Sequence, residues 1–352
     1  MIKYLGSKRK LVPVLGTIAS AVEARTALDL FTGTTRVAQE FKRRGAHVTA
    51  VDTASYSDVL ARCYIETDAT DVDKDALADA LASLAALAPE PGYFTETFCH
   101  QARYFQPKNG ARVDAMREHL AEVYAESSLF PILLTALMLA ADRVDSTTGL
   151  QMAFLKQWAP RAHNDIELRM PELLPGTGSS VCGDALSVVD TLPSVDLAYL
   201  DPPYNQHRYF TNYHVWESLV RWDKPPHYGV ACKRVDARDD VTRSLFNGRR
   251  TMPPALESVI KRVRASVVIV SYNDESWVEP QQIMGWLRDA GHDDVRMLSF
   301  DYKRYVGAQI GIHNRAGVKV GTVSHLRNTE HLFLAGPSAL VDAATAAATC
   351  PG

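Results

Sequence analysis

The sequence predicts an α/β protein in which a doubly wound, mostly parallel sheet is interrupted by a helical insertion. Two observations predict this class. Near the start, the apolar run Thr26–Phe31 is followed by a loop, a helix-patterned segment at Arg36–Arg44 and a second apolar run at His47–Val51. Short β–turn–α–β units of this kind place their strands in parallel. The strand rhythm then stops near residue 66 and resumes near residue 179.

The interrupted stretch is rich in helical patterns. Apolar residues recur at helical spacing in Asp75–Leu87, Arg112–Glu126 and Leu129–Val144, and loops bearing proline or glycine separate them. Residues 147–178 are irregular and polar. The predicted organisation is a core domain of residues 1–65 and 179–335, a helical insertion of residues 66–178, and a flexible Ala-rich tail of residues 336–352.

Strand patterns return after the insertion. Ser180–Gly183 and Val195–Leu200 are short apolar runs, and Ala265–Ser271 is β-branched enough to indicate a strand buried on its two faces. Arg296–Phe300 and Glu330–Leu334 are the last strand patterns. We predict that these two pair as an antiparallel hairpin.

The composition is that of a globular protein, with 46% hydrophobic and 22% charged residues. Five cysteines, an odd number without C-x-x-C or zinc-ligand spacing, predict reduced thiols, a cytoplasmic location and no metal site. The stretch Leu11–Val22 follows basic residues, as in a signal peptide, but proline, glycine and hydroxyl residues dilute it. Leu129–Ala141 is shorter than the ~20 residues of a membrane span, so it is predicted to be a buried helix.

The charge is unevenly distributed. The formal net charge is −3, but residues 66–96 hold eight acidic residues and one lysine, which leaves 37 basic against 33 acidic residues elsewhere. Basic residues gather at Lys3–Lys10 and between Lys233 and Arg264. One face could therefore hold phosphates while another stays acidic. Solvated surface is the alternative explanation for such clusters.

The run Asp201-Pro202-Pro203-Tyr204 carries the strongest chemical signal. It follows the strand Val195–Leu200 directly, and ligands in open α/β sheets bind beyond the carboxyl ends of strands. Two prolines stiffen the turn, so that it presents one carboxylate, outward carbonyls and one aromatic ring. Such a group can bind an aromatic amine through two N–H hydrogen bonds and a stacked ring. The structural alternative is a tight surface turn.

The motif order resembles the alpha group of amino-methyltransferases, the Dam-like or D12 class of adenine-specific DNA methylases. The DPPY tetrad and Ile2–Lys8 are the specific matches, and the weaker ones are Phe31–Thr35, Asp52, Tyr93–Asp114 and Gly183-Asp184. Gln206–Leu219 looks more like restriction–modification members than like housekeeping Dam enzymes. The resemblance implies a Rossmann-like class I methyltransferase fold, S-adenosylmethionine as cofactor, double-stranded DNA as substrate and a target-recognition role for the helical insertion.

The resemblance also implies cofactor-binding residues. Asp52 would bind the ribose and Asp184 the adenine amine, while Tyr4 and Lys8 would contact the carboxylate of the cofactor or shape the pocket. In purely structural terms, Asp52 could instead cap a helix, Asp184 could form an Asx turn, and the basic N-terminal arm could lie on the surface. Thr35 stands where the family often has a second glycine, which leaves the path of this loop open. The implied set is Tyr4, Lys8, Asp29, Phe31, Gly33, Thr34, Thr35, Asp52 and Asp184.

The same resemblance implies how the substrate is held. Asp201 and the Pro202 carbonyl would accept the two N6 hydrogens of an adenine flipped out of the duplex, and Tyr204 would stack on the base. Aromatic residues after the tetrad could instead be core. A cognate restriction endonuclease would act separately. The expected substrate-binding residues are Asn205, Arg208, Tyr209, Tyr213, Lys233, Arg234, Tyr302 and Tyr305.

Three other functions compete with DNA adenine methylation. An amino-methyltransferase could act on RNA adenine or protein glutamine, although the Asp that opens the tetrad disfavours glutamine. A non-catalytic DNA-binding subunit could keep the fold, but the intact tetrad argues against it. A nucleotide-dependent oxidoreductase is disfavoured because the sequence lacks a full G-x-G-x-x-G run.

Overall fold

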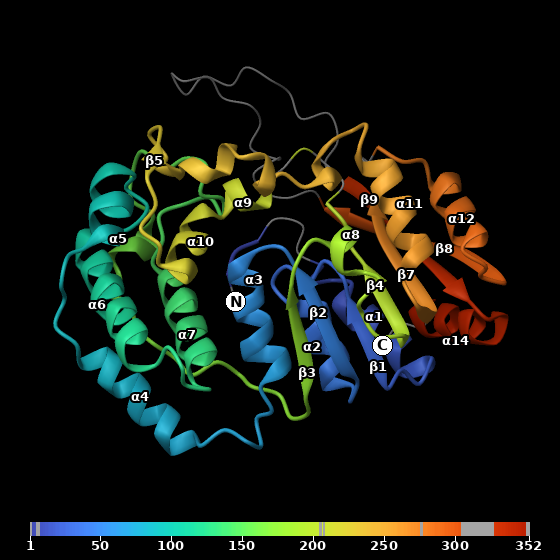
Figure 1. Cartoon of the computed structure of the whole chain (residues 1–352), viewed down its shortest axis with the longest axis horizontal. Helices are drawn as coiled ribbons and strands as arrows, with labels where there is room; N and C mark the ends of the chain where they lie inside the picture. Colours follow the sequence, from blue (N-terminus) through green and yellow to red (C-terminus); the bar gives the residue numbers. More distant parts are fainter. Residues whose placement is uncertain are drawn as a thin grey trace.

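A seven-stranded sheet forms the centre of the protein (Figure 1). The computed structural model describes residues 2–4, 8–203, 206, 208–274, 277–303 and 327–349 of the chain. The strand order is β3-β2-β1-β4-β7-β9-β8. The strands are β1 (Thr26–Asp29), β2 (His47–Asp52), β3 (Gly178–Cys182), β4 (Val195–Leu200), β7 (Ala265–Asn273), β8 (Asp294–Lys303) and β9 (Arg327–Gly336). A separate two-stranded ribbon pairs β5 (His227–Tyr228) with β6 (Lys233–Arg234).

The strand directions confirm the predicted sheet. Strands β3, β2, β1, β4 and β7 are parallel, whereas β9 is antiparallel to its two neighbours, β7 and β8. The predicted β8–β9 hairpin is therefore present. Side chains alternate between the sheet faces, so that Leu197 and Tyr199 enter one apolar core while Ala198 and Leu200 enter the other. A central parallel strand must be apolar on its two faces, which explains the continuous apolar run in β4.

Helices cover the two faces of this sheet. The first face carries α1 (Val12–Ala21), α2 (Arg36–Arg43), α3 (Ser55–Ala61) and α14 (Ser338–Thr349). The second carries α8 (Ala185–Val188), α11 (Met252–Arg262) and α12 (Pro280–Asp289). Short 3₁₀ turns are η3 (Pro160–His163), η4 (Val235–Arg238), η5 (Asp240–Thr242) and η6 (Leu245–Asn247), and π-helical turns are η1 (Arg62–Glu66) and η2 (Glu96–Gln101).

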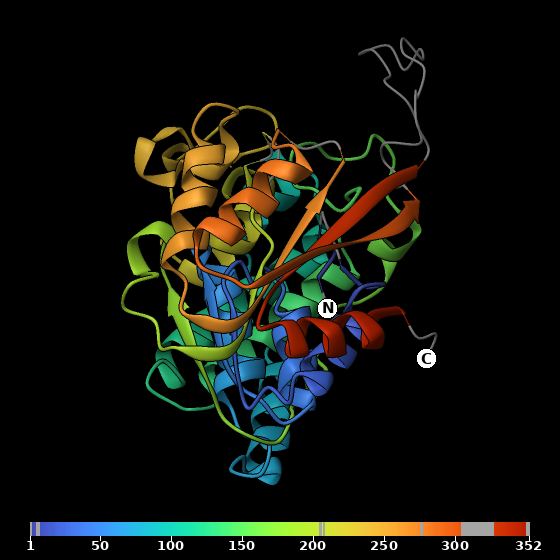
Figure 2. The same cartoon turned by 90° about the vertical axis from the view of Figure 1, so that its right-hand side faces the viewer.

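The C-terminal segment is ordered, which corrects the predicted flexible tail of residues 336–352. Residues 338–349 form α14, which packs beside α1 at the edge of the molecule (Figure 2). Val341 and Ala344 are fully buried in this contact, and the hydroxyl of Thr17 on α1 lies 3.4 Å from the carbonyl of Ala347. Alanine favours helix strongly, and a three-residue spacing of small apolar residues supplies the stripe that packs. Residues 350–352 lie outside the described part of the chain.

The predicted helices of the insertion are present but do not stand apart from the sheet domain. They are α4 (Lys74–Ala86), α5 (Tyr93–Thr95), α6 (Pro107–Val123) and α7 (Phe130–Arg143). The segment after the tetrad, with α9 (Tyr209–Asn212) and α10 (His214–Arg221), joins this helical layer (Figure 1). Arg117 of α6 donates hydrogen bonds to the carbonyls of Leu219 and Val220, 2.8 and 2.9 Å away. The layer therefore draws on chain beyond residues 66–178.

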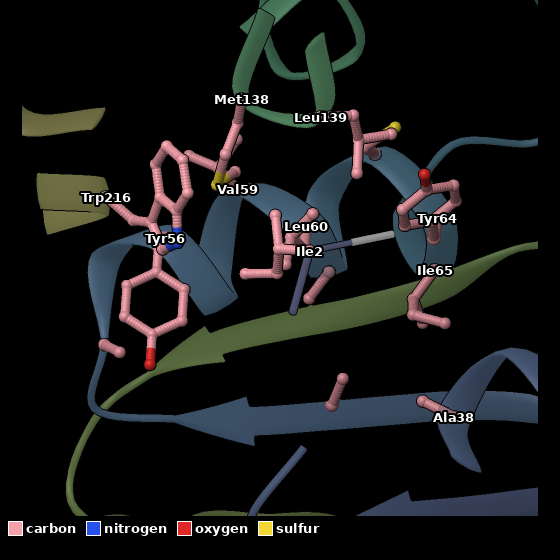
Figure 3. Close-up of a cluster of buried hydrophobic side chains, with 14 of the residues drawn as sticks. Ile2, Ala38, Tyr56, Val59, Leu60, Tyr64, Ile65, Met138, Leu139 and Trp216 are labelled. Atoms are coloured by element: carbon pink, nitrogen blue, oxygen red, sulfur yellow. The ribbon is translucent and has the colours of Figure 1, made fainter. Parts of the chain in front are cut away.

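A shared hydrophobic core joins the helical layer to the sheet. Met138 and Leu139 of α7 face Val59 and Leu60 of α3, and Trp216 of α10 closes the cluster (Figure 3). The whole of α7 except its two ends is buried, as predicted for Leu129–Ala141. Among the described residues, no helix is long and apolar enough to cross a membrane.

One buried carboxylate ties α6 to the segment around α5 within the insertion. Asp114 of α6 accepts hydrogen bonds from the backbone N–H groups of Gly92, Phe94 and Thr95 and from the Thr95 hydroxyl, at 2.6 to 2.9 Å. Without this carboxylate, several buried donors would lack a hydrogen-bond partner. Asp114→Ala is therefore expected to lower the free energy of unfolding by about 3 kcal/mol. Urea unfolding measures this.

The exposed N-cap of α4 provides a matched control for that substitution. Asp73 accepts hydrogen bonds from the N–H groups of Asp75 and Ala76 at the surface. Water can replace this carboxylate, so Asp73→Ala is expected to cost only about 1 kcal/mol. Equal losses in the two variants would contradict the role assigned to Asp114.

Candidate active site

Acidic residues gather at the carboxyl ends of the parallel strands β1, β2 and β4. Asp29 ends β1, Asp52 ends β2, and Asp201 directly follows β4. From β1 the chain moves outward to β2 and β3, and it then returns to the other side of β1 and continues outward from β4 to β7. The strand order therefore reverses between β1 and β4, and ligands of doubly wound sheets bind at such a switch point. A cavity of about 750 Å³, counting the space open to solvent, lies there.

Many of the sequence-predicted residues line this main cavity. They are Tyr4, Phe31, Asp52, Asp184, Asp201, Pro203, Arg208 and Tyr209. A smaller adjoining cavity, of about 330 Å³, shares Tyr4, Phe31 and Asp201 with it and is also lined by Lys8, Asp29 and Thr34. The two cavities therefore form one site, with Asp201 at their junction.

The loop after β1 adopts left-handed backbone at two positions. Gly33 has φ +51° and donates its N–H to Oδ2 of Asp52 at 2.8 Å. Thr35 has φ +61°, so threonine occupies the conformation for which glycine would be the easy choice, at a cost of roughly 1–2 kcal/mol. Its hydroxyl donates to the Thr34 carbonyl at 2.7 Å and accepts from Gln39 at 2.8 Å.

These bonds settle the path of the loop and correct the expectation for Thr35. Its side chain is fully buried and lies outside the two cavities, so Thr35 shapes the loop and does not line the site. Thr34, one residue earlier, lines the smaller cavity.

Asp29 has a buried oxygen with spare accepting capacity. Its Oδ2 accepts from the Thr32 hydroxyl at 2.9 Å and from the N–H of Ala38 at 3.1 Å. Among the described residues, Oδ1 has no hydrogen-bond partner. Burial raises the pKa of Asp29 to about 7. An orphaned buried acceptor of this kind matches a ligand that brings a cationic N–H donor.

Asp52 and Asp184 line the main cavity and also hold backbone. Asp52 accepts from the N–H groups of Gly33 and Ala54 at 2.8 and 3.0 Å, and burial raises its pKa. Asp184 caps α8 by accepting from the N–H of Leu186 at 3.0 Å. Asp184 thus makes the local turn considered from the sequence, whereas Asp52 is not a helix cap, because Ala54 is the N-cap of α3. Each carboxylate nevertheless keeps its backbone hydrogen bonds. They coexist with exposure to the cavity, because each carboxylate oxygen can accept more than one hydrogen bond.

Asp201 is held by a charged neighbour. The ammonium of Lys8 lies 3.0 Å from its Oδ1 and also contacts the carboxylate of Glu330 on β9. Burial raises the pKa of Asp201 to about 6, and the charge of Lys8 opposes that rise. Lys8 was expected to contact the carboxylate of the cofactor or to shape the pocket, and the structure places it in the lining of the smaller cavity, between two protein carboxylates.

Aromatic rings form one wall of the site. Tyr4 stacks on Tyr209 and Tyr213, with ring centroids 5.2 and 4.7 Å apart. Tyr209 lines the main cavity, but Tyr213 is fully buried outside it. Tyr213 therefore supports Tyr4 from behind, which corrects its expected contact with substrate.

Arg234 is also corrected. Its side chain is 1% exposed and its guanidinium holds Asp223 through two contacts of 2.6 and 2.7 Å and Asp236 through two of 2.7 and 3.0 Å. Two bidentate carboxylates occupy the donors that a phosphate would need. Arg234 therefore anchors the segment around β6, while its neighbour Lys233 is half-exposed.

Some expected site residues lie wholly or partly outside the described part of the chain. Tyr204, Asn205 and Tyr305 fall outside the described residues, and only the backbone of Tyr302 is described, at the end of β8. Their expected roles stay predictions. In the described part of the tetrad, Asp201 and Pro203 line the main cavity, whereas the side chain of Pro202 is buried and is not part of its lining.

The cavity also has walls that the sequence did not indicate. Thr53 and Ala185 follow an acid at the end of a strand, so the rule of carboxyl ends could have found them. Thr242, Ser244 and Phe246 come from a loop with no motif, and no sequence signal marks them. Phe246 meets Phe31 edge to face, with centroids 5.0 Å apart. The remaining residues of this kind are Leu30, Phe210 and Asn247.

A third cavity, of about 650 Å³, adjoins the site and is lined by several basic residues. Arg208 lines this basic cavity as well as the main one, and Arg238 and Arg243 complete a set of three arginines. The guanidinium of Arg238 lies 3.7 Å above the ring centre of Tyr228. Polar Gln206 and Asn212 add hydrogen-bonding groups.

The sheet order, the acids at the switch point and the acid–diproline turn define a Rossmann-like methyltransferase. The sequence model of the D12 class N6 adenine-specific DNA methyltransferases matches residues 4–268. The chain belongs to this family, as the motif resemblance predicted. Membership of this family favours adenine in DNA as the methyl acceptor over adenine in RNA and glutamine in protein. It also argues against a nicotinamide-dependent oxidoreductase.

Named relatives are restriction–modification methylases, which confirms the expected kinship. The chain is 29% identical over 320 residues to the type II methyltransferase M.NlaIII of Neisseria lactamica, covering 86% of this chain and 92% of that protein. It is 26% identical over 326 residues to the modification methylase StsI of Streptococcus sanguinis, covering 86% of this chain but 49% of StsI. The type II methyltransferase M.CviAII of Paramecium bursaria Chlorella virus 1 is 25% identical over 313 residues, with 84% and 90% covered.

Proposed function

We propose that the joined cavities bind S-adenosylmethionine together with an adenine turned out of duplex DNA, and that Asp201 aligns N6 of this adenine for methylation. The observation that carries the proposal is the position of Asp201 at the junction of the two cavities. Family membership supplies the reaction, and the site supports an assignment of roles within it.

The residues present fit the cofactor. The unpartnered oxygen of Asp29 suits its α-amino group, and Asp52 retains accepting capacity for ribose hydroxyls. Asp184 suits the amine of its adenine ring, and Phe31 and Phe246 offer apolar surface to that ring. When bound, S-adenosylmethionine supplies an electrophilic methyl group on a positively charged sulfur.

The chain's own residues address the weak nucleophilicity of the adenine amine. Its lone pair is delocalised into the ring, so hydrogen bonds from N6–H to Asp201 and to the Pro202 carbonyl would favour a tetrahedral nitrogen. The carboxylate of Asp201 would also stabilise the positive charge that grows on N6. Asp201 must be ionised for these roles. The nearby charge of Lys8 favours that state.

The limited exposure of Asp201, whose side chain is 19% exposed, supports base flipping. The target amine cannot reach Asp201 while it is stacked in a duplex, so the nucleotide must rotate outward. Arg208 and Tyr209 lie at the cavity where the extruded nucleotide would enter. We assign base stacking to Tyr204, on the motif alone. We further infer that a cognate restriction endonuclease acts separately, because two of the relatives, StsI and LlaI, are named as modification methylases.

Transfer of tritiated methyl groups tests this function. Purified protein, labelled S-adenosylmethionine and duplex DNA of mixed sequence are expected to give labelled N6-methyladenine after digestion to nucleosides. Equal amounts of RNA and of protein substrate are expected to stay unlabelled. Label in N4-methylcytosine, or label confined to RNA, would contradict the proposal. Methylation-sensitive sequencing of the same DNA then identifies the recognition sequence.

The basic cavity is expected to hold DNA phosphates, and Arg243 tests this. Its guanidinium is half-exposed and pairs with Asp240 at 2.6 Å. A phosphate can compete for an exposed pair, so Arg243→Ala is expected to weaken duplex binding about fivefold and to reduce the slope of log affinity against log salt by about one. Fluorescence anisotropy over a salt series measures both quantities.

Arg169 is the matched control for the phosphate contact. It is likewise exposed and pairs with Glu167 at 2.7 Å, but it does not line the basic cavity. Arg169→Ala is expected to leave the affinity and the salt slope unchanged. If the two substitutions weaken binding equally, the DNA path does not follow the basic cavity.

A further inference from the structure

We propose that Glu330 is a positioning residue for methyl transfer, because it holds the ammonium of Lys8 between itself and Asp201. This inference rests on the proposed function of Asp201. Glu330 lies on β9, opposite Asn273 of β7 and Phe300 of β8. It is outside residues 4–268, the part of the chain that matches the family.

The contacts form a chain of alternating charges. Lys8 lies 3.0 Å from Asp201 and directly contacts the carboxylate of Glu330, and its side chain is only 9% exposed. The same oxygen of Glu330 accepts a hydrogen bond from the Ser271 hydroxyl at 2.7 Å. Glu330 is thus fixed from β7 on one side and fixes Lys8 on the other. The N-terminal arm, β4 and β9 are joined at one ammonium.

A buried glutamate is unusual at this position of β9, between two neighbouring strands. Removing a carboxylate from water costs several kcal/mol, and an apolar residue would suit a strand between two neighbours better. Buried charge that perturbs an adjacent reactive group is typical of functional sites. The one reactive group beside this pair is Asp201, among the residues that the structure describes.

Glu330 divides the charge of Lys8 between two carboxylates. If Lys8 paired with Asp201 alone, its full attraction would make Asp201 a weak hydrogen-bond acceptor. With Glu330 present, Lys8 keeps Asp201 ionised near neutral pH but leaves it basic enough to bind N6–H strongly. Other ionisable groups around Asp201 are Asp29 on β1 and Tyr199 on β4, whose burial raises the pKa of each. The negative charge of Glu330 likewise raises the pKa of Asp201.

The pH dependence of kcat tests this role. With saturating DNA and cofactor, Glu330→Gln is expected to move the acidic limb of the profile at least about half a pH unit lower, because one neighbouring negative charge is lost. The same variant is expected to lower kcat at pH 8 about tenfold, with KM for DNA changed less than about twofold. Glu330→Asp keeps the charge but retracts it, so an intermediate kcat and a smaller shift are expected.

Ser299→Ala is the control for a merely structural role. It removes a 3.0 Å contact between Ser299 and His331 in the same β8–β9 hairpin, away from Lys8. It is expected to leave the acidic limb in place. An unshifted limb in folded Glu330→Gln, or an equal shift in Ser299→Ala, would overturn the inference. If Glu330→Gln does not fold, wild-type kcat in Glu330→Asp would overturn it. Absence of transfer by the wild type would instead refute the proposed function.

Discussion

Replacement of Asp201 by alanine is expected to reduce methyl transfer by about 10³-fold, while the affinity for S-adenosylmethionine changes by less than about threefold. The reason is the position of this carboxylate at the junction of the cavities, beyond the end of β4. In the proposed function it acts on the adenine amine, whereas Asp29 and Asp52 would remain to hold the cofactor. Single-turnover methylation and equilibrium cofactor titration separate these effects.

Asp201→Asn distinguishes charge from shape at the same position. Asparagine keeps one carbonyl acceptor, so it can still bind one N6 hydrogen, but it cannot stabilise positive charge. An intermediate loss of about 10²-fold is expected. Asp190→Ala, which removes a surface carboxylate paired with Arg262, is the control and is expected to be silent. Asp201→Ala activity within tenfold of wild type would remove this residue from the reaction.

Gly33→Ala is expected to weaken S-adenosylmethionine binding by at least about tenfold and to lower the free energy of unfolding by about 1–2 kcal/mol. Two physical effects coincide here. The backbone has φ +51°, and an added Cβ would lie 3.1 Å from the ring of Tyr4. The loop or the ring must therefore shift, and each of them belongs to the cofactor side of the site. Calorimetric titration and thermal unfolding provide the two readouts.

Gly45→Ala separates backbone strain from the collision with Tyr4. Gly45 has φ +91°, and a Cβ there would meet no atom within 4 Å. It ends the turn after α2, remote from the cavity. A similar loss of stability is expected without any change in cofactor affinity. If Gly45→Ala weakens the cofactor as much as Gly33→Ala does, general destabilisation accounts for the effect and the proposed contact is wrong.

Local patterns along the chain were enough to predict most strands. The run in β4 matches its prediction at each end, and β2 extends one residue further than predicted. These patterns succeed because a strand between two helical layers must be apolar on its two faces. The tail was mispredicted, because an Ala-rich segment becomes a stable helix only when a neighbour such as α1 buries it.

Some residues that look equivalent in the sequence occupy different environments in the tertiary structure. Tyr209 lines the main cavity while Tyr213, one helical turn later, is buried, although each suited a base-binding wall equally well by sequence. Arg234 and Arg243 belong to one basic run, yet Arg234 is enclosed by two carboxylates and Arg243 is half-exposed. The order of residues along the chain identifies the type of each side chain, but tertiary packing decides which neighbours contact it.

The sequence by itself determined the strands of the sheet, its hairpin and the position of the acid–diproline turn from Asp201 to Pro203, because apolar periodicity and proline stiffness act over a few neighbouring residues. Tertiary structure alone decided which groups surround that turn. Lys8, Asp201 and Glu330 are separated by more than a hundred residues from one another, and only the order of the strands brings their charges together. Coulomb interaction depends on distance through space, which no local pattern records.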